Sequence, residues 1–276
     1  MTQSLAQETA RLTFIGAGNM AGSIIGGLVS KGYPPHLIVA ADPNEQALQQ
    51  LQQTHGIATN ADNLAAVSAA DVIILAVKPQ VMEQVLRPLS TTAAQNKPLI
   101  VSIAAGITVT NIGCWLAPEL PIVRTMPNTP ALVQTGATGL YANALVSTEQ
   151  KSIATTIFEA IGIALWFDDE EDMDRVVALS GSGPAYFFLV MEAMEQAGVD
   201  LGLDRRVARQ LTLQTALGAA KLALAQDLEP AELRRRVTSP GGTTEAAIQQ
   251  LQDGGLEQLF DSAIRAASAR SKELAG

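Results

Sequence analysis

Residues 237–245 (VTSPGGTTE) contain two adjacent glycines flanked by serine and threonine hydroxyls, and a helical pattern follows them. A glycine-rich turn that opens a helix presents several backbone N–H groups to a small anion, and the positive end of the helix favours that anion. The neighbouring hydroxyls add further donors. The segment therefore predicts a loop that binds the carboxylate of a small substrate.

A second glycine-rich turn has the spacing of a dinucleotide-binding loop. Gly16, Gly18 and Ala21 follow an apolar run at 12–15, and Asp42 comes about twenty residues later, as the fingerprint requires. The glycines let the backbone approach a pyrophosphate. Asp42 either binds the ribose and disfavours a 2′-phosphate, or caps the next helix. The turn predicts NADH or NADPH as cofactor.

Residues that end the neighbouring strands are expected at the same edge of the sheet, where ligands of such folds bind. Lys78 ends one strand; it either contacts the cofactor or is a solvated loop lysine. Segments 102–106 and 124–130 end the next strands, with small residues that leave room for a flat ring or only pack tightly. The residues expected to bind the cofactor from these motifs are Gly16, Ala17, Gly18, Asn19, Met20, Asp42, Ala76, Val77, Lys78 and Pro79.

Apolar, β-branched runs alternate with helical patterns through the first two thirds of the chain, which implies right-handed βαβ crossovers. The predicted fold is α/β, with a Rossmann-like doubly wound sheet at residues 11–168 and an all-α dimerisation domain at 169–276. Residues 1–10 are expected to form a mobile tail. Strands are expected at 12–15, 37–41, 71–77, 98–103, 121–125, 139–141 and 164–167, and helices at 19–30, 45–53 and 80–89.

The last third of the chain has helical patterns throughout. Residues 182–184 (SGP) predict a helix start, and Gly198 is expected to end this helix after Ala197. The helix is apolar on almost every side, so it is expected to be buried all round. A second helix is predicted over 205–225. A small helical domain buries such a helix more easily against another subunit, which predicts an obligate homodimer.

Composition argues against several classes of function. The formal net charge of the 276 residues is −9, so a basic face for nucleic acid is not expected. No apolar run approaches the roughly 18 residues that a membrane-spanning helix needs, so no membrane association is expected. One cysteine, Cys114, and two histidines cannot form a disulfide framework or a zinc site. Cys114 is expected to be a small buried filler in a cytoplasmic protein.

Catalysis has to proceed without histidine, because His36 and His55 are expected in a loop and a surface turn outside every motif. Oxidation of an alcohol usually needs a strong general base. Reduction of an imine needs a hydride and a hydroxyl donor, since the imine nitrogen can be protonated beforehand. The available residues therefore favour an oxidoreductase that acts on a C=N bond.

Together these segments resemble the pyrroline-5-carboxylate reductases, which reduce 1-pyrroline-5-carboxylate to L-proline in the last step of proline biosynthesis. The resemblance covers nearly the whole chain, from about residue 12 to residue 274. Segments 179–186 and 237–244 are highly specific. The matching segments are FIGAGNM (14–20), AVKPQ (76–80), MPNTP (126–130), LSGSGPAY (179–186) and VTSPGGTT (237–244).

The resemblance implies a substrate site at the dimer interface. The side chain of Ser239 and the N–H groups of Gly242 and Thr243 would hold the substrate carboxylate. The hydroxyl of Thr244 would bond the ring nitrogen, which makes Thr244 the expected catalytic residue.

The resemblance also adds Asn63 and Ala105 to Lys78 around the cofactor. Asp42 departs from the family pattern, because members that use NADPH usually have a small hydroxyl or basic residue there. The choice between NADPH and NADH therefore stays open.

The main alternative is a related imine or β-hydroxyacid reductase of the same two-domain plan. A hydroxyacid enzyme would need a catalytic lysine on the helix after residues 182–184, and residues 185–197 contain none. A catalytically silent NAD-dependent sensor would have lost the 239–244 loop, which is intact. Whether dimers assemble further into rings is left open.

Overall fold

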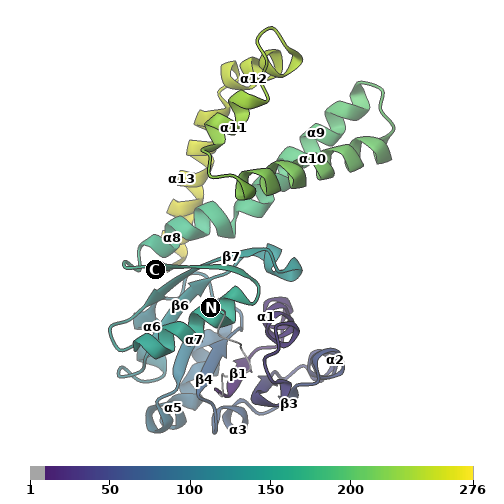
Figure 1. Ribbon diagram of the computed structural model, residues 1–276. Coiled ribbons are helices and arrows are strands. Elements are labelled where there is room, and N and C mark those ends of the chain that lie inside the picture. Colours follow the sequence, from purple (N-terminus) through teal and green to yellow (C-terminus); the bar gives the residue numbers. More distant parts are fainter. Residues whose placement is uncertain (1–9, 276) are drawn as a thin grey trace. The chain divides into compact units, whose positions relative to one another are not determined.

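The chain divides into two compact units in the computed structural model, which describes residues 10–275 (Figure 1). Unit 1 comprises Met1–Ser182 together with Ala267–Gly276, and unit 2 comprises Gly183–Ala266. Except for Ala10, the expected N-terminal tail lies outside the described residues.

Unit 1 is built on an eight-stranded sheet with the order β3-β2-β1-β4-β5-β6-β7-β8. All neighbouring strands are parallel except β6 and β7, which are antiparallel. Strand order reverses at β1 and β4, as in a doubly wound sheet, so the predicted α/β class is confirmed. The strands are β1 (Leu12–Ile15), β2 (Ile38–Ala41), β3 (Ala58–Asn60), β4 (Val72–Leu75), β5 (Leu99–Ser102), β6 (Ile122–Met126), β7 (Gly136–Ala142) and β8 (Gly162–Phe167).

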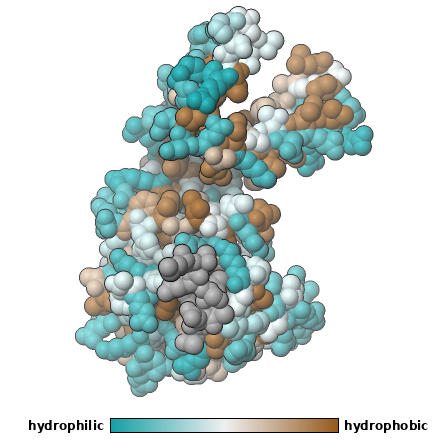
Figure 2. All heavy atoms as spheres, in the orientation of Figure 1, coloured by the Kyte–Doolittle hydropathy of each residue, from teal (hydrophilic) through white to brown (hydrophobic). Residues whose placement is uncertain are grey.

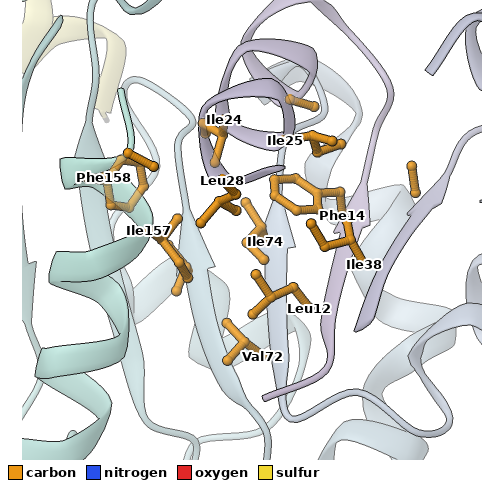
Figure 3. Packing of buried hydrophobic residues seen from close by; sticks show 14 of the residues in the cluster. Leu12, Phe14, Ile24, Ile25, Leu28, Ile38, Val72, Ile74, Ile157 and Phe158 are labelled. Carbon is orange, nitrogen blue, oxygen red and sulfur yellow. The ribbon is translucent and has the colours of Figure 1, made fainter. Parts of the chain in front are cut away.

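Helices cover both faces of this sheet because successive side chains of a strand point to opposite faces. Leu12 and Phe14 of β1 pack in one core with Ile24 of α1, as Figure 3 shows. Ile15 belongs to the core on the other face, with Met82 of α4. The helices of unit 1 are α1 (Asn19–Ser30), α2 (Glu45–His55), α3 (Asn63–Val67), α4 (Pro79–Leu86), α5 (Ser90–Asn96), α6 (Val109–Trp115), α7 (Thr148–Glu159) and α8 (Asp172–Val176).

Unit 2 is all-helical, as predicted. Helices α9 and α10 pack against each other, and α13 begins in unit 2 but ends in unit 1. The predicted second helix matches α10 in both bounds. The helices are α9 (Gly183–Asp200), α10 (Arg205–Ala225), α11 (Pro230–Arg236), α12 (Thr243–Asp253) and α13 (Leu256–Ala275).

The predicted start of α9 is confirmed, whereas its predicted cap and its predicted end are wrong. Ser182 has a helical backbone and follows a π-helical turn at Val177–Gly181, so it does not cap a new helix. Gly198 does not end α9 either. A Cβ at Gly198 would lie 3.3 Å from the Cβ of Ala208, so this glycine allows α9 and α10 to approach closely.

Within a single chain, α9 is mostly uncovered, and the prediction of burial all round is wrong for the chain alone. Gly183 is its buried residue, whereas Phe187, Phe188 and Leu189 are 67%, 63% and 66% exposed. Figure 2 shows hydrophobic side chains gathered on the α9–α10 hairpin. An apolar surface of this kind on a soluble fold is typical of a subunit interface.

One helical run in the described residues, Asp172–Asp200, is long and apolar enough to cross a membrane by length and composition. No such run was predicted from the sequence, because a new helix was expected to start at residues 182–184. In the structure the turns are continuous, which lengthens the run. Core helices of soluble proteins reach the same length and hydropathy.

Cys114 is exposed on α6, so its expected role as a buried filler is wrong. The side chains of Ile112 and Leu116 are the buried ones on this helix and its end. Cys114 lies two residues from each, and positions two apart on a helix do not share a face.

Candidate active site

The loop between β1 and α1 has the geometry that a pyrophosphate needs. Gly16 has φ +106°, and a Cβ there would lie 2.7 Å from the carbonyl oxygen of Ala76, so only glycine fits. Gly18 is the N-cap of α1, and neither a side-chain cap nor an acidic residue lies at this helix end. The first N–H groups of α1 therefore remain available to an anion.

A cleft of about 800 Å³ opens at the carboxyl edge of β1, β2 and β4. Its charged lining residues are Lys78, Asp42 and Asp62. Seven of the residues expected to bind the cofactor line this cleft: Gly16, Gly18, Asp42, Asn63, Ala76, Val77 and Lys78. The structure thus gathers these residues from four separate loops.

Asp42 ties the glycine loop to the end of β2. Its Oδ2 accepts the N–H of Ala17 at 2.8 Å, and its Oδ1 accepts the N–H of Asn44 at 2.8 Å. Helix α2 is capped by Asn44, whose side chain accepts the N–H groups of Gln46 and Ala47. Asp42 is therefore not the cap of α2, and its contact with a ribose remains a prediction.

Asn63 offers an acceptor in the cleft that a cofactor would satisfy. Its Oδ1 is buried and has no hydrogen-bond partner among the described residues. Buried polar atoms are normally paired, so an orphaned acceptor in a cleft fits a ligand donor such as a ribose hydroxyl or a ring amine. The residues present thus fit a dinucleotide.

Five predicted cofactor residues lie outside this cleft. Ala17 and Asn19 line a second cleft, of about 690 Å³, between α1 and α2. Met20 packs against the core, and Pro79 is the first residue of α4. Ala105 is exposed in the turn after β5. Their cofactor contacts stay predictions.

Four residues that line the larger cleft from one helical segment were not predicted from the sequence. Val81, Gln84, Val85 and Pro88 line it from α4 and the turn after it. The signal was present, because these positions recur every three or four residues and so share one face of a helix.

His55 is not the solvated surface residue that the sequence suggested. It ends α2 and lines the second cleft, where its ring lies 3.0 Å from the place of a Cβ on Gly26. Burial lowers the pKa of His55 below its usual value. The glycine lets the ring pack on the backbone of α1.

The 237–245 loop lies in unit 2 and opens α12, as predicted. Gly242 is the N-cap of α12, and its N–H donates to the carbonyl of Ser239 at 3.0 Å. Glu245 accepts the N–H of Gly241 at 2.7 Å. Thr243 and Thr244 are exposed in the first turn, where backbone N–H groups have no carbonyl one turn earlier to bond.

In residues 10–275, no group of three or more histidine, cysteine, aspartate or glutamate side chains is placed to hold a metal ion.

Two known families match separate parts of the chain. Residues 11–106 match the family "NADP oxidoreductase coenzyme F420-dependent", and residues 170–274 match "Pyrroline-5-carboxylate reductase dimerisation". The first match covers the glycine loop and the cleft. The second covers α9 to α13 and accounts for the uncovered apolar surface as one that oligomerisation buries.

Relatives match over nearly the full length. A pyrroline-5-carboxylate reductase from Pseudomonas aeruginosa is 55% identical over 97% of this chain and 98% of its own, and one from Vibrio alginolyticus is 42% identical over the same shares. The solved structure of a pyrroline-5-carboxylate reductase from Coxiella burnetii is 44% identical, with a TM-score of 0.94 over 98% of this chain and 100% of that chain. The Plasmodium falciparum structure with NADP bound is 28% identical, with a TM-score of 0.85 over 98% and 99%.

The fold and the cleft define a nicotinamide-nucleotide-dependent oxidoreductase with a Rossmann domain and a helical dimerisation domain. The full-length relatives specify it further. The chain belongs to the pyrroline-5-carboxylate reductase family.

Proposed function

We propose that the chain reduces 1-pyrroline-5-carboxylate to L-proline with NADPH or NADH, the last step of proline biosynthesis. The observation that carries this proposal is the pairing of two sites in one chain of this family. In unit 1, no side chain caps the start of α1 after the glycine loop. The cleft beside this loop contains the buried Oδ1 of Asn63, which has no hydrogen-bond partner among the described residues. Unit 2 has an exposed helix start with hydroxyls beside it.

For the substrate, we propose that the 239–244 loop binds the carboxylate and the ring nitrogen. The hydroxyl of Ser239 and the N–H groups of Gly242 and Thr243 would hold the carboxylate. Because the N–H of Gly242 bonds Ser239 in the structure, substrate binding would exchange that partner. The hydroxyl of Thr244 would contact the nitrogen.

For the cofactor, we propose that the N–H groups at the start of α1 hold the pyrophosphate and that Asp42, Asn63 and Lys78 contact the rest. Ala17, Asn19, Met20, Ala76, Val77, Pro79 and Ala105 complete the proposed contacts. When bound, the cofactor supplies the hydride that adds to C5 of the protonated imine. The electron pair of the C=N bond moves to the nitrogen, and the product is the amine.

The chain's own residues would lower the barrier mainly by placing the two reactants together. Thr244 would orient the nitrogen and stabilise the amine as it forms. No residue has to remove a proton from carbon, which fits a site with no histidine in the proposed machinery.

A steady-state assay with the purified chain tests the proposal. With 1-pyrroline-5-carboxylate and NADPH or NADH, we expect loss of nicotinamide absorbance and an equal amount of L-proline. The alternative is a related imine or β-hydroxyacid reductase. It would be favoured if L-proline does not form while another cyclic imine or a β-hydroxyacid is turned over.

The charge of Asp42 should set part of the cofactor preference. We expect Asp42→Ser, and the near-isosteric Asp42→Asn, to raise the NADPH to NADH ratio of kcat/KM about tenfold. One unfavourable charge contact of about 1.4 kcal/mol corresponds to that factor. Asp42→Asn keeps an acceptor for Ala17 and so separates charge from loop support.

Asp62→Asn is the matched control for this measurement, because Asp62 lines the same cleft but caps α3. It should leave the ratio unchanged. If neither Asp42 variant shifts the ratio, Asp42 only supports the loop.

We also propose a cytoplasmic homodimer as the working form, with dimers free to join into larger rings. In functional terms, residues 11–168 would bind the cofactor, and residues 169–276 would bind the substrate and dimerise. Light scattering of the purified chain distinguishes a dimer from its multiples.

A further inference from the structure

The C-terminal turn of α13 is fixed on unit 1 by a buried polar contact. Ser271 Oγ donates to Oδ1 of Asp174 at 2.6 Å, and both residues are buried. The same Oδ1 lies 3.9 Å from a guanidinium nitrogen of Arg124, which is buried on β6. A hydrogen bond to a buried, ion-paired carboxylate is strong and directional, so it sets where the helix end lies.

The same buried arginine is connected to the start of α6 through Glu170. Oε1 of Glu170 lies 3.2 Å from Nη1 of Arg124 and accepts the backbone N–H of Val109 at 2.9 Å. Val109 is the first residue of α6. Arg124 therefore links the end of α13 to the point where the loop after β5 enters α6.

The loop between β5 and α6, residues 103–108, is packed directly under the last turn of α13. Gly106 is buried with φ +74°, and a Cβ there would lie 3.2 Å from the carbonyl oxygen of Leu274. The neighbouring Ala105 is exposed. The loop is thus held in the middle by Leu274 and at its end by Glu170.

This loop lies where the nicotinamide half of a dinucleotide has to go. Asp42 ends β2 on one side of the glycine loop, and β4 and β5 lie on the other side. A dinucleotide with its pyrophosphate at α1 and its adenosine towards Asp42 extends its nicotinamide over β4 and β5. Lys78 follows β4, and the 103–108 loop follows β5.

We propose that Ser271 and the backbone of Leu274 are positioning elements for the nicotinamide end of the cofactor. They act through the 103–108 loop, which they hold so that Ala105 faces the ring. The inference rests on the proposed function, in which Ala105 contacts the cofactor. It extends that function by assigning a role in cofactor placement to the last turn of the chain.

Binding measurements on Ser271→Ala test the proposal. NADH affinity is followed by nicotinamide fluorescence, and the affinity for ADP-ribose, which lacks the nicotinamide, is followed by calorimetry. We expect the Kd of NADH to rise about tenfold and that of ADP-ribose to stay unchanged. Ser271→Thr, which keeps the hydroxyl, should restore most of the NADH affinity.

Ser268→Ala is the matched control, since Ser268 lies on the same helix one turn earlier and is half-buried. It should change neither Kd. Equal weakening of NADH and ADP-ribose in Ser271→Ala would mean general loosening of unit 1 and would overturn the proposal, as would no change in either. If Ser271→Ala does not fold, the near-isosteric Ser271→Cys decides the question by the same pair of affinities.

The wild-type chain separates this inference from the proposed function. A wild type that neither binds NADH or NADPH nor forms L-proline would contradict the proposed function. A wild type that does both, with an unaffected Ser271→Ala variant, would contradict only the positioning role.

Discussion

Replacing Thr244 by Ala is expected to lower kcat about 100-fold and to leave the Kd of NADH and NADPH unchanged. Removal of one preorganised donor to a charge that changes in the transition state costs roughly 10²–10³ in kcat. Thr244 is exposed in the first turn of α12, whereas the glycine loop lies in unit 1. Turnover is measured with 1-pyrroline-5-carboxylate at saturating cofactor, and cofactor affinity by nicotinamide fluorescence.

Two neighbouring variants make this experiment specific. Thr244→Ser keeps a hydroxyl and should recover most of the turnover. Thr243→Val keeps the backbone N–H that is proposed to bind the carboxylate, so it should have a small effect on kcat. Turnover near the wild-type value in Thr244→Ala would show that the hydroxyl has no role in the chemical step.

Placing a charge on the uncovered face of α9 is expected to separate the subunits and to abolish activity at low protein concentration. Phe187 is 67% exposed in the single chain, on a helix of the dimerisation region. Burying a phenylalanine contributes about 2 kcal/mol, and a twofold interface contains each residue twice. Phe187→Asp should therefore cost at least about 4 kcal/mol, which raises the dimer Kd roughly a thousandfold.

Light scattering and activity over a range of protein concentrations check this prediction. Both the dimer fraction and the specific activity should rise with concentration, because the substrate site is proposed to need the partner subunit. Val133→Asp is the control, since Val133 is 70% exposed in unit 1. A fully active monomer of Phe187→Asp would contradict the dependence on dimerisation, and an unchanged dimer would remove Phe187 from the interface.

The sheet was largely predictable because its central strands are buried on both faces. Such strands form short apolar runs, as β2, β4 and the first three residues of β5 do, and β1 differs only by Thr13. Strand β3 was missed because Ala58–Asn60 is short and partly exposed, so it has no apolar run. The antiparallel direction of β7 depends on the connection between Met126 and Gly136, which turns the chain back beside β6, and local periodicity does not encode strand direction.

The glycine loop was predictable for a different reason, because its backbone geometry restricts the residue type. Gly16 has a conformation and a neighbour that exclude a side chain. The place of Asp42 in the cleft was predictable but its contacts were not, because the cap of α2 is Asn44 two positions later. Sequence spacing alone does not show which of two nearby acceptors, Asp42 or Asn44, caps the helix.

The network around Arg124 was not predictable from sequence patterns. Its members come from β6, α8 and α13 and from the segment between β8 and α8, and the pair Asp174 and Ser271 is 97 residues apart. Each residue alone resembles an ordinary surface polar residue. Only the tertiary structure shows that Arg124 is buried and that its partners converge on it.

Because unit 1 is divided between Met1–Ser182 and Ala267–Gly276, its last part is synthesised only after unit 2. During synthesis a chain emerges from its N-terminus, and domains fold as their residues become available. The sheet of unit 1 is synthesised before unit 2, yet Ser271 and Leu274 leave the ribosome after it. The contact between Leu274 and the 103–108 loop therefore forms only after all of unit 2 has been synthesised.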